Sequence, residues 1–307
     1  MEFHKYKKIK PLGDPDNEDI FLDPQDEIFI QEKLDGANFR FIIQRGILIF
    51  GSRGQQLTSD EGEDTNVGKS FVMCLEHIRD TLKGKDLTEY EGLIFYGECM
   101  VKHTIHYEWE KIPAFLGFDI MLEDKFLHTT LVKKTFADLG LDMVPEIKRT
   151  FAGDIKEVTD ADVPISKYAP LSNINQQAEG IVFKNHTKQL YAKYVRLAFK
   201  EDNKLTFGEI GKFAEGFDAQ LIAKYCTNAR IEKAIWKFVD MGKQLDMALT
   251  PMISGFVYQD IWEEEWKSII KLNKELDMRK FRKGVLLRCK AVLDQMITNN
   301  AILKKKE

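Results

Sequence analysis

Short hydrophobic runs bounded by turn residues dominate the chain up to about residue 205. They are too short for helices and rich in β-branched and aromatic residues, which is typical of strands. We therefore expect strands at residues 28–30, 38–43, 47–51, 93–98, 114–121, 180–184 and 190–195. Gln44, Arg45 and Gly46 separate two of these runs and predict a tight hairpin turn. Helical periodicity at 68–82 and 129–139 interrupts the strands, so the pattern predicts an α+β domain.

After residue 208 the hydrophobic spacing changes to that of amphipathic helices. Helices are expected at 208–226, at 229–245 and from 261 to about 297, the last with a break near Gly284. The polar stretch 200–204 is the predicted seam between the two patterns. We therefore divide the chain into an α+β domain, residues 1–206, and a small all-α domain, residues 207–307.

Composition narrows the class of protein. Hydrophobic residues make up 44% of the 307 residues and charged residues 31%, which excludes a disordered chain. No apolar run reaches the length of a membrane span, and the N-terminus lacks the apolar core of a signal peptide. The four cysteines are far apart in sequence and form no CxxC pair, so a disulfide framework is not expected. These features favour a cytoplasmic protein.

The net charge of −4 conceals an uneven distribution. Residues 14–32 hold eight carboxylates and no Lys or Arg, whereas residues 265–307 hold twelve Lys or Arg against five Asp or Glu. A basic segment on a mildly acidic protein is compatible with a nucleic-acid surface, although a solvated helix face has the same composition. The predicted helical domain is therefore a candidate RNA-binding domain.

The most informative segment runs from Phe29 to Ile43. One strand-like run ends, the turn Lys33-Leu34-Asp35-Gly36 follows, and a second run begins. A lysine on such a turn can project from a sheet edge into a cleft, and Gly36 permits a positive φ and the close approach of a ligand to the backbone. The tetrapeptide alone has little specificity, because a surface hairpin can contain the same residues.

Other charged residues end or interrupt the hydrophobic runs, where a buried sheet would not tolerate them unpaired. Two carboxylates, three lysines and one aromatic ring in one cleft would suit a nucleoside triphosphate with a divalent metal. The residues concerned are Lys33, Glu98, Phe118, Glu179, Lys184 and Lys193. Alternation along 180–184 places Gly180, Val182 and Lys184 on one face of their strand.

In this order the motifs KLDG, SRG, FYGE, FLGFDI, EGIVFK and YAKYVR resemble those of the covalent nucleotidyltransferases. The closest resemblance is to the RNA ligase 2 family of ATP-dependent, nick-sealing RNA ligases. Glu32 directly before Lys33, and Asn38 two residues after Gly36, carry this distinction. The motifs cover residues 29–201, and the rest of the chain matches only in its helical character. The resemblance implies an ATP-grasp-like ligase domain of antiparallel sheets with flanking helices.

The resemblance also implies the chemistry. Lys33 attacks the α-phosphorus of ATP to form a lysyl-adenylate, AMP moves to an RNA 5′-phosphate, and a 3′-hydroxyl then displaces AMP. ATP and Mg²⁺ or Mn²⁺ are the implied cofactors, and nicked or broken RNA is the implied partner in RNA repair. A monomer is expected, with an end-healing kinase-phosphatase as a candidate partner. Because an attacking lysine must be neutral, we expect Lys184, Lys193, the metal ion and burial to lower the pKa of Lys33.

Each candidate residue takes a role from the resemblance. Phe118 would stack on adenine, Val182 would cover the other face of the base, and Glu32 would help to read its edge. Glu98 would hold the ribose, and Glu179, with Glu98, would bind the metal ion. The remaining roles are Arg53 at the ribose-phosphate or RNA terminus, Lys184 and Lys193 at the phosphates, and Asn38 in the RNA-dependent steps.

One departure from the family pattern concerns the last motif, where a second lysine is expected at Val195. Arg196 or Lys200 could supply the missing charge, although Arg196 falls on the opposite strand face unless a bulge intervenes. Other functions also remain open. A DNA ligase or a capping-type guanylyltransferase is disfavoured because no strand pattern of a C-terminal OB-fold follows. A non-catalytic RNA-binding protein would leave the Lys33 constellation unexplained.

Overall fold

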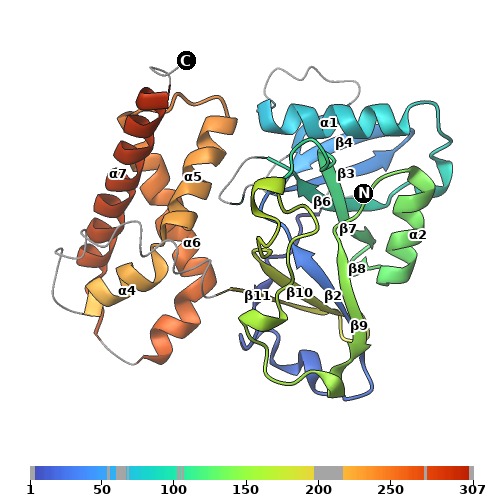
Figure 1. Ribbon diagram of the computed structural model, residues 1–307, viewed down its shortest axis with the longest axis horizontal. Helices are drawn as coiled ribbons and strands as arrows, with labels where there is room; N and C mark the ends of the chain where they lie inside the picture. The colour runs from blue at the N-terminus through green and yellow to red at the C-terminus, as the bar shows by residue number, and fades with distance from the viewer. Residues whose placement is uncertain are drawn as a thin grey trace. The chain divides into compact units, whose positions relative to one another are not determined.

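The computed structural model describes residues 4–53, 56–59, 67, 69–101, 105, 107–196, 217–272 and 275–303. The chain divides by its internal contacts into two compact units, Met1–Arg196 and Leu197–Glu307 (Figure 1). The boundary predicted at 206/207 falls within 197–216, outside the described residues.

The first unit contains a six-stranded antiparallel sheet. Its strands, in spatial order, are β5 (Gln56–Ser59), β4 (Ile47–Ser52), β3 (Ala37–Gln44), β6 (Ile94–Cys99), β7 (Phe115–Leu122) and β8 (Lys125–Phe126). The predicted hairpin joins β3 and β4, and positive φ at Arg45 and Gly46 gives it the twist that a tight turn requires.

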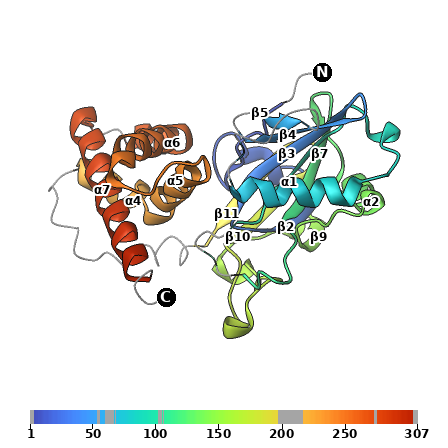
Figure 2. The same ribbon diagram turned by 90° about the horizontal axis from the view of Figure 1, so that it is seen from above.

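Two helices, α1 (Lys69–Leu82) and α2 (Thr129–Leu139), cover the outer face of this sheet (Figure 2). Their apolar sides pack on phenylalanines that alternate along the strands, among them Phe41, Phe95 and Phe115. Phe41 and Phe95 stack with ring centroids 4.5 Å apart. Each of the two sheets of this unit has a hydrophobic core on its outer face, and this aromatic core is the larger of the two.

A five-stranded sheet forms the other layer. In spatial order its strands are β1 (Lys10–Pro11), β11 (Leu190–Val195), β10 (Gly180–Asn185), β2 (Glu27–Lys33) and β9 (Glu146–Phe151). All pairs are antiparallel except β1 with β11. The described residues also contain the short 3-10 helices η1 (Glu18–Phe21), η3 (Thr88–Tyr90), η4 (Ala152–Asp154), η5 (Asp160–Asp162), η6 (Leu171–Asn173) and η8 (Met247–Leu249).

The inner faces of the two sheets meet in a cluster that includes Tyr6, Tyr96, Phe126 and Tyr191. This cluster draws side chains from both sheets and from the N-terminal segment. Burial of these large rings holds the sheets together at one end of the space between them.

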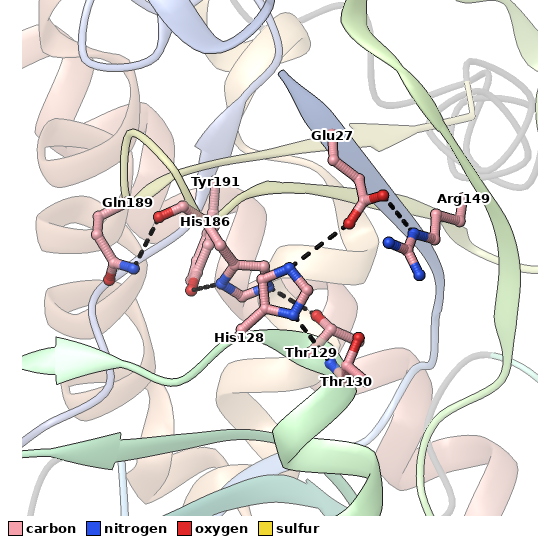
Figure 3. A network of polar contacts seen from close by, with 8 residues as sticks. All are labelled: Glu27, His128, Thr129, Thr130, Arg149, His186, Gln189 and Tyr191. Atoms are coloured by element: carbon pink, nitrogen blue, oxygen red, sulfur yellow. Dashed lines mark hydrogen bonds and ion pairs between the residues drawn. The ribbon is translucent and has the colours of Figure 1, made fainter. Parts of the chain in front are cut away.

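A network of polar contacts also links the layers (Figure 3). His128 caps the N-terminus of α2 and lies 3.5 Å from Glu27 Oε2 on β2. His186 follows β10, and its ring nitrogens lie 2.7 Å from Thr129 Oγ1 and 3.3 Å from the Tyr191 hydroxyl. The first turn of α2 is therefore attached to the five-stranded sheet.

The second unit is helical in its described part. Its helices are α4 (Phe217–Tyr225), α5 (Asn228–Asp240), α6 (Thr250–Lys271) and α7 (Met278–Leu303). Their apolar sides form one core, with Ile231, Ile253, Val257, Phe281 and Cys289 fully buried.

The helix break predicted near Gly284 is wrong. Helix α7 runs through Gly284, and the chain turns instead between Lys271 and Met278. A Cβ at Gly284 would lie 2.1 Å from Ile222 Cδ1 of α4, so this glycine allows two helices to approach closely.

The predicted fold class is confirmed: antiparallel sheets with flanking helices are followed by a helical unit. Within the described residues, no helix is long and apolar enough to span a membrane.

Candidate active site

Three adjacent strands of the five-stranded sheet, β2, β10 and β11, carry the candidate residues on its inner face. Antiparallel register aligns three rows across it: Lys33, Gly180 and Val195; Gln31, Val182 and Lys193; and Phe29, Lys184 and Tyr191. Because alternate residues of a strand share a face, all nine point to the same side. We call this side the Lys33 face. The predicted common face of Gly180, Val182 and Lys184 follows from the same register.

Lys33 ends β2 and its ammonium faces a carboxylate. Lys33 Nζ donates a hydrogen bond to Glu179 Oε2 at 2.6 Å, and both side chains are largely buried. The second predicted carboxylate comes from the other sheet, where Glu98 Oε1 on β6 accepts a hydrogen bond from Gly36 N at 3.0 Å. The structure therefore brings Lys33, Glu98 and Glu179 together.

Gly36 is required for close approach rather than for a positive φ. Its φ lies outside the left-handed region, and a Cβ there would lie 2.6 Å from the carbonyl oxygen of Cys99 and 2.7 Å from Glu98 Cγ. The adjacent Asp35 is also fixed, because its Oδ2 accepts from Ile105 N and its N–H donates to the Tyr107 hydroxyl. The Lys33 turn is therefore held against β6.

Burial is the largest single influence on the pKa of Lys33 and lowers it, whereas the charges of Glu179 and Glu98 raise it. The balance leaves the pKa of Lys33 above its ordinary value. The predicted lowering by neighbouring lysines is not found, because the nearest charges are carboxylates.

Lys184 lies in the third row of the Lys33 face and is 1% exposed. Its ammonium forms a 2.8 Å ion pair with Asp119 Oδ1 and donates to the Phe118 carbonyl oxygen at 2.7 Å. Asp119 also accepts a 2.6 Å hydrogen bond from the Tyr6 hydroxyl. The charge of Lys184 is directed to Asp119, and its role at the phosphates stays a prediction.

Phe118 and Asp119 both face the space between the sheets although they are sequence neighbours. A β-bulge explains this, since Tyr96 pairs with Asp119 while Gly97 pairs with Gly117, which leaves Phe118 as the extra residue. Phe118 packs edge-on against Tyr6 with ring centroids 4.9 Å apart, and its side chain remains half-buried.

Glu32 points to the opposite side of the sheet from Lys33. It is 3% exposed, accepts hydrogen bonds from Ser166 Oγ at 2.6 Å and from Lys167 N at 3.2 Å, and pairs in register with Ile181 of the outer core. Burial raises its pKa, an effect that these hydrogen bonds reduce. The Glu32 carboxylate is therefore occupied on the side away from the Lys33 face, and a role of Glu32 at the adenine edge stays a prediction.

The remaining predicted residues are distributed around the same space. Val182 and Lys193 are half-buried neighbours in the middle row. Asn38 pairs in register with Glu98, and its Oδ1 is buried without a hydrogen-bond partner among the described residues. Arg53 is exposed just after β4 and acts electrostatically on Tyr6.

Val195 occupies the same row as Lys33. It lies across Gly180 from Lys33. Arg196 does not replace the missing lysine, because its guanidinium donates to the Ala178 carbonyl oxygen and to Gln177 Oε1, both on the side away from the Lys33 face. Lys200, the other candidate, lies outside the described residues.

Sequence reasoning gave no role to Tyr6 or Asp119. No pattern in the N-terminal segment indicates that Tyr6 enters the site. Asp119 in a strand was visible as a buried charge, but its orientation depends on the bulge at Phe118. Gln31 was also missed, although alternation from Lys33 places it on the same face.

The fold of the first unit, two sheets with Lys33, Glu98 and Glu179 between them, can be compared with known structures. A Naegleria gruberi RNA ligase with pyrophosphate superimposes with a TM-score of 0.51 at 16% identity, covering 66% of this chain and 59% of that one. A variant of that ligase with ATP and Mn gives a TM-score of 0.52 at 17% identity, covering 66% and 58%. At this identity the likeness concerns the fold alone, which is similar to that of the Naegleria RNA ligase.

The RNA ligase family model matches residues 26–200, more than half of the chain. This protein therefore belongs to the RNA ligase family. A comparison with curated proteins finds no match. The chain spans about three fifths of the length of the Naegleria ligase to which it is similar.

Proposed function

We propose that this protein is an ATP-dependent RNA ligase that seals nicks in duplex RNA and so acts in RNA repair. The observation that carries the proposal is the contact of 2.6 Å between Lys33 Nζ and Glu179, with Glu98 opposite and Val182 and Lys193 on the same sheet face. Membership of the RNA ligase family supports the same conclusion.

The proposed reaction has three steps. Lys33 Nζ, once deprotonated, forms a bond to the α-phosphorus of ATP while the bond to the bridging oxygen breaks and pyrophosphate leaves. An oxygen of the RNA 5′-phosphate then displaces Lys33 from the AMP phosphorus. Finally the RNA 3′-hydroxyl loses its proton, attacks the 5′-phosphorus and releases AMP.

The donor set suits a hard divalent cation such as Mg²⁺ or Mn²⁺. Mg²⁺ usually takes one or two carboxylates, with substrate phosphates and water completing its coordination. Glu179 and Glu98 would provide these carboxylates, because both lie near Lys33 and act on its charge. The structure of a Naegleria variant with ATP and Mn supports this choice. When bound, the cation supplies positive charge that offsets the phosphates and the two glutamates.

Neutralising the charge of Glu179 and Glu98 has a consequence for Lys33. These two carboxylates raise the pKa of Lys33 against the lowering by burial. With their charge offset, burial dominates and favours the neutral amine that attacks phosphorus. Arginine could not replace Lys33, because a guanidinium does not lose its proton.

Other residues of the cleft receive narrower roles in the proposal. Phe118 and Val182 flank the adenine, Glu98 holds the ribose, and Lys193 offsets phosphate charge. Arg53 contacts the ribose-phosphate or the RNA terminus, and Asn38 acts in the RNA-dependent steps. Lys184 is reassigned as a positioning residue, because its contact with the Phe118 carbonyl fixes the strand that presents the aromatic ring.

The helical unit is proposed to bind RNA. One exposed face of α7 carries Arg279, Arg282, Lys283 and Lys290 at helical spacing. A row of cations on one helix face suits the phosphate backbone of RNA, which dominates the affinity of such contacts. Localisation in the cytoplasm, a monomeric state and cooperation with an end-healing kinase-phosphatase complete the proposal.

A sealing assay tests the function directly. The pure protein, ATP and Mg²⁺ are incubated with a nicked duplex whose 5′-phosphate strand is labelled, in versions with RNA or DNA on each side of the nick. The proposal predicts a joined strand and a transient AMP-capped strand when RNA flanks the nick. Sealing only of all-DNA nicks would indicate a DNA ligase, and transfer of GMP in a parallel reaction with GTP in place of ATP would indicate a capping-type enzyme. Salt-sensitive RNA binding without any joined or adenylated strand would contradict catalysis.

A further inference from the structure

Gln31 is a buried polar residue at the centre of the Lys33 face for which the reaction as described has no role. Its side chain is 1% exposed, and its Nε2 makes no hydrogen bond with any described residue. Buried amide groups are nearly always paired, and an unpaired donor destabilises the fold. An unpaired buried donor on the Lys33 face therefore calls for an explanation.

The position of Gln31 indicates what its partner is. In the register of β2 and β10 it lies directly opposite Val182, and it precedes Lys33 by two residues on the same face. Neighbouring strands are about 4.8 Å apart, and two residues along a strand span about 7 Å. Gln31 is thus within one small molecule's length of both the nucleophile and the residue proposed to cover the base.

Glu32 is its natural comparison, because it is adjacent in sequence and equally buried. Its two carboxylate oxygens accept hydrogen bonds from Ser166 and Lys167 on the opposite side of the sheet. The Glu32 carboxylate is therefore bonded and faces away, whereas the Gln31 Nε2 makes no hydrogen bond with a described residue and lies on the Lys33 face.

We propose that Gln31, rather than Glu32, reads the adenine base of ATP. A purine held between Phe118 and Val182 presents an edge to Gln31, an inference that rests on the proposed function. The amide offers an acceptor, Oε1, and a donor, Nε2. Adenine offers the complementary pair, an N6 amino donor next to a ring-nitrogen acceptor, and a glutamine can bind both at once.

The two hydrogen bonds proposed between Gln31 and adenine also determine which nucleotide analogue tests the proposal best. Guanine is an imperfect one, because at its N1 edge a flipped amide would pair with O6 and N1–H equally well. Purine riboside is cleaner, since it keeps the ring nitrogens and lacks only the N6 amino group. Loss of that group removes the partner of Oε1 and leaves a buried acceptor unpaired.

The test is a cycle that removes the amino group from the ligand and the amide from the protein. Binding of the α,β-methylene triphosphates of adenosine and of purine riboside, which cannot transfer a nucleotide, is measured by calorimetry with Mg²⁺. The wild type is compared with Gln31→Met, which keeps the length of the side chain, and with Glu32→Gln as the matched control. We expect wild type and Glu32→Gln to prefer the adenosine compound by about tenfold to a hundredfold, and Gln31→Met to bind both alike.

A thermal unfolding scan distinguishes recognition of the adenine base by Gln31 from a purely structural role of this residue. Gln31→Met removes a buried unpaired amide, so it should unfold at or above the wild-type temperature while losing its preference. A supporting residue would lower the unfolding temperature and weaken both ligands equally. If Gln31→Met does not fold, the wild-type preference still decides, because a ratio near one overturns the inference without any variant.

Parallel labelling with α-labelled ATP distinguishes the two proposals. Covalent labelling of wild type with an unchanged preference in Gln31→Met overturns the inference alone. A preference lost in Gln31→Met without labelling of wild type supports the inference and contradicts the ligase function. Failure of wild type to bind the adenosine compound overturns both.

Discussion

Lys184 on β10 and Asp119 on β7 form a 2.8 Å ion pair that joins the two sheets of the first unit, with side chains 1% and 0% exposed. Two charges removed from water in this way are stable only if each is fully paired. The Tyr6 hydroxyl and the Phe118 carbonyl supply the additional hydrogen bonds. The pair therefore fixes both the spacing of the sheets and the strand that presents Phe118.

Breaking this pair from one side should be strongly destabilising. Lys184→Met leaves the Asp119 carboxylate buried with only the Tyr6 hydroxyl, and we expect the free energy of unfolding to fall by about 3–5 kcal/mol. The double variant Lys184→Met with Asp119→Leu should lose less than the sum of the single variants, because no charge remains unpaired. Urea unfolding of the four proteins measures this. If the loss of unfolding free energy in the double variant equals the sum of the losses in the two single variants, Lys184 and Asp119 do not act as a pair.

The network around His186 predicts a dependence of stability on pH. Burial lowers the pKa of His186 to about 3, with further lowering by Lys184 and His128. In the unfolded chain the pKa is about 6.5, so below that pH the unfolded state binds a proton that the folded state excludes. The contribution of neutral His186 to the free energy of unfolding is therefore fully present above about pH 6.5 and is lost as the pH falls toward 3.

The expected slope is at most about 1.4 kcal/mol per pH unit between pH 6 and pH 4. The variant His186→Gln should have a flatter profile over this interval, since all other titrating groups are common to both proteins. Chemical unfolding at a series of pH values gives the difference. Parallel profiles for wild type and His186→Gln would show that His186 takes up a proton in the folded state as readily as in the unfolded one.

Two helical glycines make a matched pair. A Cβ at Gly255 in α6 would meet nothing within 4 Å, so Gly255→Ala should stabilise the protein by about 0.5–1 kcal/mol. Gly284→Ala in α7 gains the same helix propensity but meets Ile222 Cδ1 at 2.1 Å. We expect it to be less stable than Gly255→Ala by at least about 1 kcal/mol. Equal stabilisation of both would mean that the Ile222 side chain can turn away from the added methyl group at no cost.

The basic face of α7 can be tested by its effect on RNA affinity. Replacing Arg282, Lys283 and Lys290 with Gln should weaken RNA binding and reduce the slope of log affinity against log salt by about 0.7–0.9 per lost phosphate contact. The control replaces the exposed Lys224, Lys233 and Lys243 of the same unit with Gln, which changes the net charge equally. Similar losses in both triple variants would assign the effect to net charge rather than to α7.

The sequence predicted the interior of both sheets, because buried strands carry the clearest hydrophobic pattern. The strands it missed, β1, β5, β8 and β9, are those at the four sheet edges. Strand β9 reads EIKRTF and is mostly exposed, so it shows neither alternation nor a buried run. Edge strands with charged side chains are difficult to distinguish from loops by pattern alone.

The sequence predicts which residues of the candidate site share a sheet face wherever side chains alternate regularly along a strand. Lys33, Val182 and Lys193 lie on one face as alternation requires, and Val195 follows by the same rule. The orientation of Phe118 together with Asp119 was not predictable, because it depends on one extra residue in β7. The partner of Lys184 was hidden for the same reason, since sequence shows a buried charge but not the charge that it faces.

The most direct test of the central claim is the covalent state of Lys33. The protein is first treated with pyrophosphate to strip any bound AMP, then incubated with ATP and Mg²⁺, and its peptides are mapped by mass spectrometry alongside Lys33→Arg. We expect one AMP on the peptide containing Lys33 in wild type and none in the variant. An adduct on another lysine, or no adduct in the stripped wild-type protein, would contradict the assignment of Lys33 as the nucleophile.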